Sequence, residues 1–342
     1  MWFCSRGGDA ADRIVIPLRL GGSGGHAGAA TENKMSLQTC LRFIGLGFVL
    51  WALGALPAGT DVAAAVTPRT APSPVRLPVS APAHVATNRP VLWFPVGEQM
   101  FYKVQWGVLI VANTQVTSEY IEEDGRELLA IRVTTRTKSI LSTFYPVDDF
   151  IESVVDPVTF LPVRFTKRLS EGRYRLHEIT TFDHKARMAH WRHLLKNDSK
   201  DFAIDADTRD LISYMFYMRS QKFEPGKHYD FRVMADEKLY DLMVEARDIE
   251  RLDIGNYTKI RTLKLDPEAK FHGLFVRVGK LEVWISDDER CVCVRATAQA
   301  PIIGTIRLLI DRVEGPGDDY WTHPGNTNYP QIARNPVEGP KK

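Results

Sequence analysis

Hydrophobic and polar residues alternate at every second position through most of residues 92–314. This period places the apolar side chains on one face of a β-strand. The first such run, residues 100–106, puts Tyr102 and Trp106 on the same face. A turn signal separates most successive runs, and the Asp124-Gly125 step tolerates the positive φ of a tight hairpin. The pattern therefore predicts short antiparallel strands that follow one another in a meander.

The same alternation predicts further strands across the rest of this region. They cover residues 128–133, 150–155, 163–168, 174–182, 188–194, 229–233, 238–246, 257–265, 279–286, 291–298 and 304–313. Strands do not alternate with long helical patterns, which argues against a doubly wound nucleotide-binding sheet.

One segment breaks the alternation. The run Asp207-Thr208-Arg209-Asp210 has the residues of an N-cap and an acidic first turn, and Pro225-Gly226 ends the segment. Apolar residues then recur at helical spacing, at Leu211, Tyr214, Met215 and Met218. We expect a helix of about 14 residues that covers an apolar surface. Core packing explains its methionines better than a methionine-rich ligand gate does.

Together these elements predict a mainly β protein. We expect an antiparallel meander that forms a curved sheet or half-barrel, with one amphipathic helix packed against its concave face. A closed barrel and a two-sheet sandwich share the strand pattern, and the single helix favours the unclosed sheet. An open aromatic face would form an apolar trough, so the candidate ligand-facing residues are Tyr102, Trp106, Tyr214, Met215, Met218 and Trp284.

The N-terminal region has the pattern of a secretion signal at residues 35–65. Arg42 gives the positive start, residues 43–58 form a 16-residue apolar run, and Ala63-Ala64-Ala65 offers a cleavage site. A membrane span needs about 20 such residues. We therefore expect cleavage, export to the periplasm and no integral span afterwards. Residues 1–34 are then an upstream extension from a misassigned start codon, and lipidation at Cys40 is disfavoured because Cys40 precedes the apolar run.

Residues 66–91 and 315–342 differ in composition from the region between them. The first segment has prolines at 68, 72, 74, 78, 82 and 90 and is predicted to be a disordered tether. The second, rich in Pro, Gly and Asn, is predicted to be a flexible tail. Residues 92–314 then form a single β-rich domain.

Charge and cysteine content exclude several classes of protein. Beyond residue 65 the chain keeps 39 Lys and Arg against 38 Asp and Glu, without the basic face that nucleic-acid binding needs. Only Cys291 and Cys293 remain in that part of the chain, too few for a disulfide framework. We interpret them as small buried hydrophobic residues on one face of a strand rather than a redox pair.

Residues that could carry chemistry are present without a recognisable arrangement. His177, His184, His190 and His193 lie close in sequence, but on strands they do not share a face, so no metal site is expected. The pairs Glu122-Glu123, Asp148-Asp149 and Asp287-Asp288 are interpreted as turn or edge residues, because adjacent carboxylates on a strand point apart. Neither a nucleophile elbow nor a phosphate loop occurs. We predict no catalytic residue and no cofactor.

Three sequence segments resemble the bacterial domain-of-unknown-function family 3108, a group of exported envelope proteins. They are residues 94–107, which read FPVGEQMFYKVQWG; the helix followed by Phe223-Glu224-Pro225-Gly226-Lys227; and residues 279–288, which read GKLEVWISDD, with Gly304-Thr305-Ile306-Arg307 after them. The chain has Val111-Ala112-Asn113 where the family often has an Ala-Gly step. The resemblance spans roughly residues 92–313 and implies an exported, mostly β protein without an assigned activity.

These features favour a non-enzymatic periplasmic protein. We expect it to hold a lipophilic ligand, either a lipid or an apolar segment of an envelope partner, and to bind no nucleic acid. An envelope hydrolase with an unidentified site and a structural protein-interaction module remain as alternatives. The sequence leaves the ligand, the oligomeric state and the pathway open.

Overall fold

The computed structural model describes residues 89–138, 142–143, 145–235, 238–255, 257–271, 274–275, 280–300 and 304–316. The predicted extension and secretion signal lie outside these residues, as do most of the predicted tether and tail. Those four interpretations remain predictions. Within the described residues no helix is both long and apolar enough to cross a membrane.

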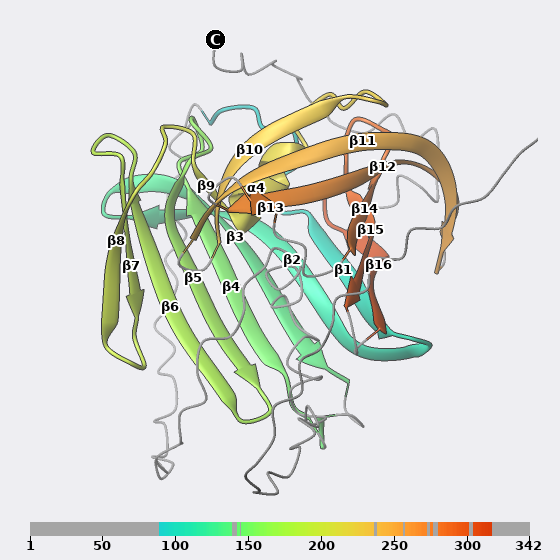
Figure 1. Cartoon of the computed structure of the whole chain (residues 1–342), viewed down its shortest axis with the longest axis horizontal. Helices are drawn as coiled ribbons and strands as arrows, with labels where there is room; N and C mark the ends of the chain where they lie inside the picture. Colours follow the sequence, from blue (N-terminus) through green and yellow to red (C-terminus); the bar gives the residue numbers. More distant parts are fainter. Residues whose placement is uncertain are drawn as a thin grey trace, which may run out of the picture. The chain divides into compact units, whose positions relative to one another are not determined.

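The described residues form one 16-stranded sheet that is curved and does not close (Figure 1). This confirms the predicted mainly β fold. The strands are β1 (Gln99–Trp106), β2 (Leu109–Glu123), β3 (Arg126–Thr137), β4 (Asp148–Val155), β5 (Pro162–Glu171), β6 (Tyr174–Asp183), β7 (Met188–His193), β8 (Asp198–Ala203), β9 (Arg209–Asp210), β10 (His228–Ala235), β11 (Lys238–Ile254), β12 (Tyr257–Phe271), β13 (Leu274–Phe275), β14 (Lys280–Ser286), β15 (Cys293–Ala300) and β16 (Gly304–Glu314).

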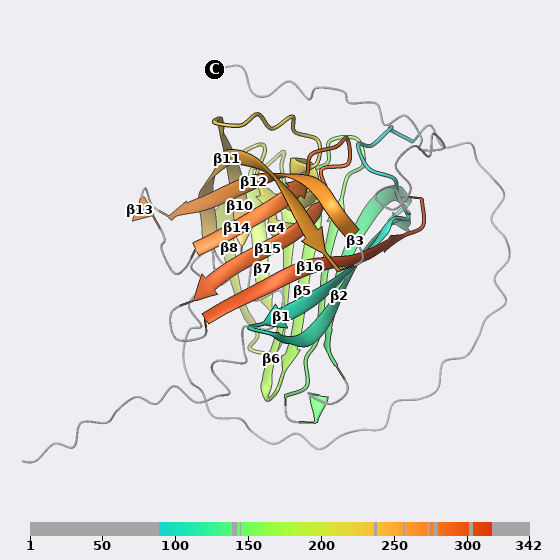
Figure 2. The ribbon, with the colours of Figure 1, turned by 90° about the vertical axis from the view of Figure 1, so that its right-hand side faces the viewer.

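The sheet consists of two arms that meet at the β1–β16 pair. One arm runs in sequence order from β1 to β8, and the other runs from β16 back to β9. The pair is antiparallel, with Gln99 opposite Glu314 and Trp106 opposite Ile306. Register shifts interrupt β1 against both neighbours, and such bulges bend a strand. Figure 2 shows the strands of the second arm crossing over those of the first, so the sheet has a concave side.

The single helix of the described residues, α4 (Leu211–Met218), lies on that concave side (Figures 1 and 2). It has 8 residues, so the predicted 14 were too many. The residues predicted to begin the helix are extended instead, because Arg209 and Asp210 pair with β10 as a short parallel strand. This pairing is also the exception to an otherwise antiparallel sheet.

The structure contains strands that the pattern did not reveal. β2 carries the polar run Asn113-Thr114-Gln115, and β8 is exposed along most of its length. Neither has the apolar alternation that marks a half-buried strand. β8 is the edge of the sheet, and on β2 the Thr114 hydroxyl bonds to Thr135 and the Gln115 amide bonds to Gln99. The Asp124-Gly125 hairpin is confirmed, with both residues at positive φ.

The helix α4 contributes to two buried clusters. Ile212 and Phe216 belong to the larger cluster, with residues from β1, β3–β6, β11, β12 and β14–β16. Leu211 and Tyr214 belong to the second, with residues of β10–β12. The helix therefore packs against both arms of the sheet.

Candidate binding cavity

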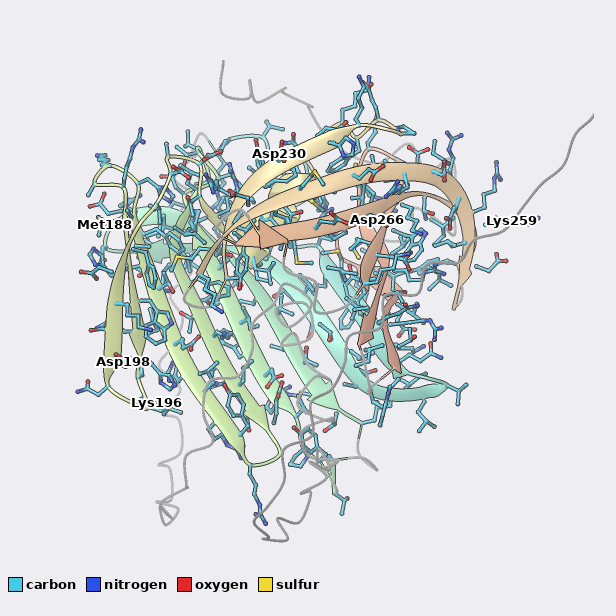
Figure 3. All side chains as sticks on the ribbon, viewed as in Figure 1. Met188, Lys196, Asp198, Asp230, Lys259 and Asp266 are labelled. Atoms are coloured by element: carbon cyan, nitrogen blue, oxygen red, sulfur yellow. The ribbon has the colours of Figure 1, made fainter. Side chains whose placement is uncertain are left out.

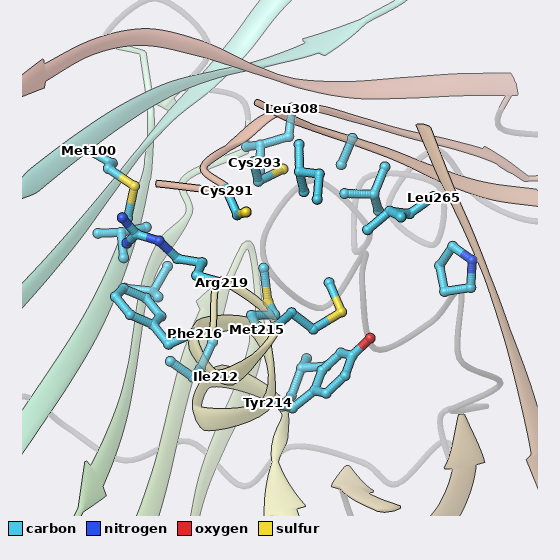
Figure 4. Close-up of a pocket in the computed structure, with 18 of the residues that line it drawn as sticks. Met100, Ile212, Tyr214, Met215, Phe216, Arg219, Leu265, Cys291, Cys293 and Leu308 are labelled. Atoms are coloured by element: carbon cyan, nitrogen blue, oxygen red, sulfur yellow. The ribbon is translucent and has the colours of Figure 1, made fainter. Parts of the chain in front are cut away.

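A cavity of about 120 Å³ lies between α4 and the concave side of the sheet. Its wall is almost wholly apolar and comes from both arms and from the helix (Figure 4). Apolar cavities of this order stay dry and take up small apolar molecules. The cavity is therefore the part of the described structure best suited to a ligand.

Strand alternation explains which side chains reach the cavity. Met100 and Tyr102 face it from β1, and Val283 and Ile285 face it from β14. In each pair the residues are two positions apart, so they share one face of the strand. Val244 does the same from β11, within the run that the sequence predicted as a strand.

Asp210 holds the helix in place beneath the cavity. Its Oδ1 accepts hydrogen bonds from the backbone N–H groups of Ile212 (2.8 Å) and Ser213 (2.9 Å), and its Oδ2 accepts one from the Ser153 hydroxyl (2.6 Å). Burial raises the pKa of Asp210 to about 6, against the opposing effect of these hydrogen bonds. The cap is Asp210, the last residue of the predicted run, whereas Asp207 is exposed and the predicted acidic first turn is absent.

Arg219 carries a charge at the cavity wall, and a buried partner neutralises that charge. Its Nη1 lies 2.7 Å from Oε1 of Glu98, with both side chains almost fully buried. Its Nε donates to the backbone carbonyl of Arg290 at 3.0 Å. Because these contacts engage the guanidinium within the protein, the wall suits an uncharged guest better than an anion.

Two phenols line the cavity in their neutral form. Burial raises the pKa of Tyr102 well above its usual value, and its hydroxyl donates to the carbonyl of Cys293 at 3.0 Å. Burial also raises the pKa of Tyr214. Within the described residues no hydrogen bond engages the Tyr214 hydroxyl, which Figure 4 shows at the far end of the ring from the helix. It is a donor that a bound molecule could use.

Cys291 and Cys293 also line the cavity, and no disulfide joins them. Their predicted place on one strand face is partly wrong. β15 begins at Cys293, and Cys291 precedes it in the left-handed region at φ 45°. Burial raises the pKa of Cys293 to about 12, which disfavours the reactive thiolate.

The structure separates the six candidate ligand-facing residues. Tyr102, Tyr214, Met215 and Met218 line the cavity, whereas Trp106 and Trp284 are not among its lining residues. Trp284 lies between two cavity-facing residues of β14 and so points to the other face. There its Nε1 donates to Glu250 at 2.9 Å, and the Arg295 guanidinium lies 3.6 Å from its ring.

Sequence reasoning missed several apolar residues that line the cavity from β11, β12 and β16, including Leu242, Leu265 and Leu308. The alternating pattern predicted the strands that carry these residues. It could not show that they line a cavity, because that depends on the pairing of the two arms, which brings together strands far apart in sequence.

The polar clusters discussed from the sequence do not form a catalytic arrangement in the described residues. No set of three His, Cys, Asp or Glu side chains there could hold a metal ion. His184 stacks on Phe182 and His190 pairs with Asp201 at 2.7 Å. Asp148 is exposed, but Asp149 is buried within β4, so its interpretation as a turn or edge residue was wrong.

A protein-family model gives the family of this chain. The model of a protein family of unknown function, DUF3108, matches residues 101–311. The chain belongs to the DUF3108 family. None of the curated proteins matches it in sequence.

Three solved structures resemble this DUF3108 protein at low sequence identity. A beta-barrel-like DUF1849 protein from Brucella abortus is 9% identical with a TM-score of 0.44, and the match covers 64% of this chain and 97% of that one. A protein with a YmcC-like fold from Bacteroides fragilis, inferred to be exported, is 8% identical (TM-score 0.29, coverage 66% and 100%). A protein from Parabacteroides distasonis, inferred to be a lipoprotein, is 6% identical (TM-score 0.28, coverage 66% and 99%).

Proposed function

We propose that this DUF3108 protein is a non-enzymatic binding protein of the periplasm that holds an uncharged lipophilic group between α4 and the curved sheet. The group would be a lipid chain or an apolar segment of an envelope protein. The single observation that carries this proposal is the apolar cavity walled by both arms and by the helix. The proposed location rests on the sequence of residues 35–65 alone.

The chemistry of the wall supports binding rather than catalysis. Its guanidinium is paired with Glu98, and its phenols and the Cys293 thiol are held neutral by burial. A hydrolase needs a base or an activated nucleophile that faces the substrate. An acyl chain needs only apolar contact, which contributes about 0.8 kcal/mol for each buried CH₂ group.

A matched pair of substitutions tests the cavity. Leu308 and Leu309 are neighbours on β16 and both are half-buried, but only Leu308 lines the cavity. Leu308→Trp fills the space that two or three CH₂ groups of a guest would occupy. We expect it to weaken uptake of a fluorescent fatty acid by about tenfold or more, while Leu309→Trp leaves uptake nearly unchanged.

Mass spectrometry of protein purified without detergent gives the independent measurement. We expect an apolar compound to copurify with the wild type and Leu309→Trp, and to be depleted from Leu308→Trp. If nothing copurifies and no fatty acid or phospholipid probe is taken up, the carrier hypothesis is wrong.

A further inference from the structure

Alternate turns of the first arm lie along one end of the sheet. Because β1 to β8 run in sequence order and antiparallel, the β1–β2, β5–β6 and β7–β8 turns share that end with the last residues of β3. Figure 1 shows these hairpins along the lower edge, and Figure 3 shows Lys196 there, at the opposite end of β7 from Met188. We call this edge the tip end.

Large aliphatic side chains are exposed in two turns of the tip end. Val108 and Leu109 of the β1–β2 turn are 89% and 58% exposed, and Leu194 and Leu195 of the β7–β8 turn are 43% and 58% exposed. Hairpin turns need only small or polar residues to form. Four aliphatic side chains in such positions are therefore not explained by the folding of the turns, and exposed apolar groups of this kind mark interaction sites.

The charges of the tip end are positive where its turns are described. Lys138 follows β3, Arg173 lies in the β5–β6 turn and Lys196 lies in the β7–β8 turn, and all three are exposed. None of them forms an ion pair within the described residues. The acids at this end, Asp148, Glu171 and Asp198, are strand residues. Glu171 is buried, and Asp148 forms an ion pair with Arg136 at 2.9 Å.

The opposite end of the same strands carries more acidic than basic residues. Its described turns contain Asp124, Asp156, Asp205 and Asp207 against Lys185 and Arg187, and the β14–β15 turn adds Asp287, Asp288 and Glu289 against the buried Arg290. Val158 is its one large aliphatic residue with high exposure among the described turns. The two ends therefore differ in both charge and hydrophobicity, although the chain as a whole is nearly neutral.

We propose that the tip end binds the surface of an anionic lipid bilayer. Val108, Leu109, Leu194 and Leu195 would enter the headgroup region, and Lys138, Arg173 and Lys196 would contact the anionic headgroups. This combination of apolar insertion and cationic contact is what retains peripheral proteins on membranes. The aliphatic groups lie on separate turns, up to roughly 30 Å apart along the sheet at about 4.8 Å per strand. A fluid surface accommodates such spacing, whereas a protein partner would favour one contiguous patch.

The proposal does not depend on the cavity or on its guest. Membrane contact would bring a lipid-binding protein close to the bilayer that contains its ligand, but the two properties are tested separately. Membrane binding without a guest in the cavity, and a guest in the cavity without membrane binding, are distinguishable results.

Hydrogen exchange of the full chain locates the contact without any substitution. Vesicles of phosphatidylethanolamine and phosphatidylglycerol should slow exchange in peptides covering residues 106–110 and 193–198. Exchange in peptides covering residues 156–160, at the opposite end, should not change. Protection at neither turn of the tip end, or equal protection at both ends of the sheet, would overturn the proposal.

Matched variants measure the apolar and the electrostatic contributions by cosedimentation with the same vesicles. Val108→Asp should reduce binding about tenfold or more. Val158→Asp, at a valine that is 78% exposed at the opposite end, should not. Lys196→Glu should reduce it about fivefold or more, unlike Lys185→Glu. Added salt and phosphatidylcholine vesicles should both weaken wild-type binding. Equal losses in both members of a pair, or equal binding to both kinds of vesicle, would contradict the proposal.

Discussion

Asp210 connects three parts of the molecule through one carboxylate. It ends β9, caps α4 through two backbone N–H groups and accepts the Ser153 hydroxyl from β4. Removing it leaves these buried donors without an acceptor, which costs more than a lost surface hydrogen bond.

Asp210→Ala should lower the free energy of unfolding by about 2 to 4 kcal/mol, because it removes a cap and orphans buried donors. Denaturant unfolding followed by circular dichroism measures this. The control is Asp207→Ala, at an exposed residue three positions earlier, which should cost less than about 0.5 kcal/mol. Similar losses in both variants would mean that the cap does not hold the helix.

The same carboxyl group should make stability depend on pH. Burial raises its pKa from 3.8 to about 6, so between these values the folded chain holds a proton that the unfolded chain has released. The free energy of unfolding should therefore fall as pH rises through that window, by roughly 3 kcal/mol from this group, and level off above it. Asp210→Asn lacks this titration. Subtracting its pH profile from that of the wild type isolates the effect, and a flat difference would contradict the raised pKa.

Between elements, the buried pair of Arg219 and Glu98 joins the end of α4 to the residue before β1. The helix ends at Met218, and Arg219 follows it as the C-cap. The guanidinium also lies 5.2 Å and 5.3 Å from the rings of Phe94 and Phe216. The pair thus fixes the helix against the strand at which the two arms meet.

Glu98→Gln should destabilise the protein by about 3 to 5 kcal/mol, because it leaves the Arg219 charge buried without its counter-ion. The double variant Glu98→Leu with Arg219→Met should recover much of that loss, since neither charge remains. Asp148→Asn breaks the exposed pair with Arg136 and should cost less than about 1 kcal/mol. Thermal and denaturant melts distinguish these outcomes. Additive losses in the double variant would show that the two charges are not coupled.

At the scale of the whole described structure, α4 keeps the two arms of the open sheet together. Strand pairing connects the arms only through β1 and β16, whereas the helix contributes side chains to both buried clusters. Phe216 packs on Phe94 with ring centroids 4.9 Å apart, and its carbonyl accepts the Trp93 indole N–H at 2.7 Å.

Phe216→Ala should lower the free energy of unfolding by about 3 to 5 kcal/mol. Hydrogen exchange should show the loss of protection in β3 and in β12 alike, because the helix supports both arms. Phe101→Ala, half-buried on the other face of β1 under Arg312, should cost about 1 kcal/mol. Loss of protection confined to one arm would mean that the arms unfold independently.

Alternation in the sequence determined most of the strands, because side-chain direction along a strand depends only on local geometry. Apolar residues at helical spacing located the helix near Leu211, and the resemblance of three sequence segments indicated the family. Local pattern did not reveal β8, whose edge position lets it be polar, or the buried state of Asp149. It also placed Trp106 and Trp284 with the cavity residues, although strand direction turns Trp284 away from the cavity. The cavity itself was decided only by the tertiary structure. Its sheet walls come from β1–β3 and from β11, β12 and β14–β16, which lie far apart in sequence. Their meeting depends on how β1 pairs with β16 and on where α4 packs.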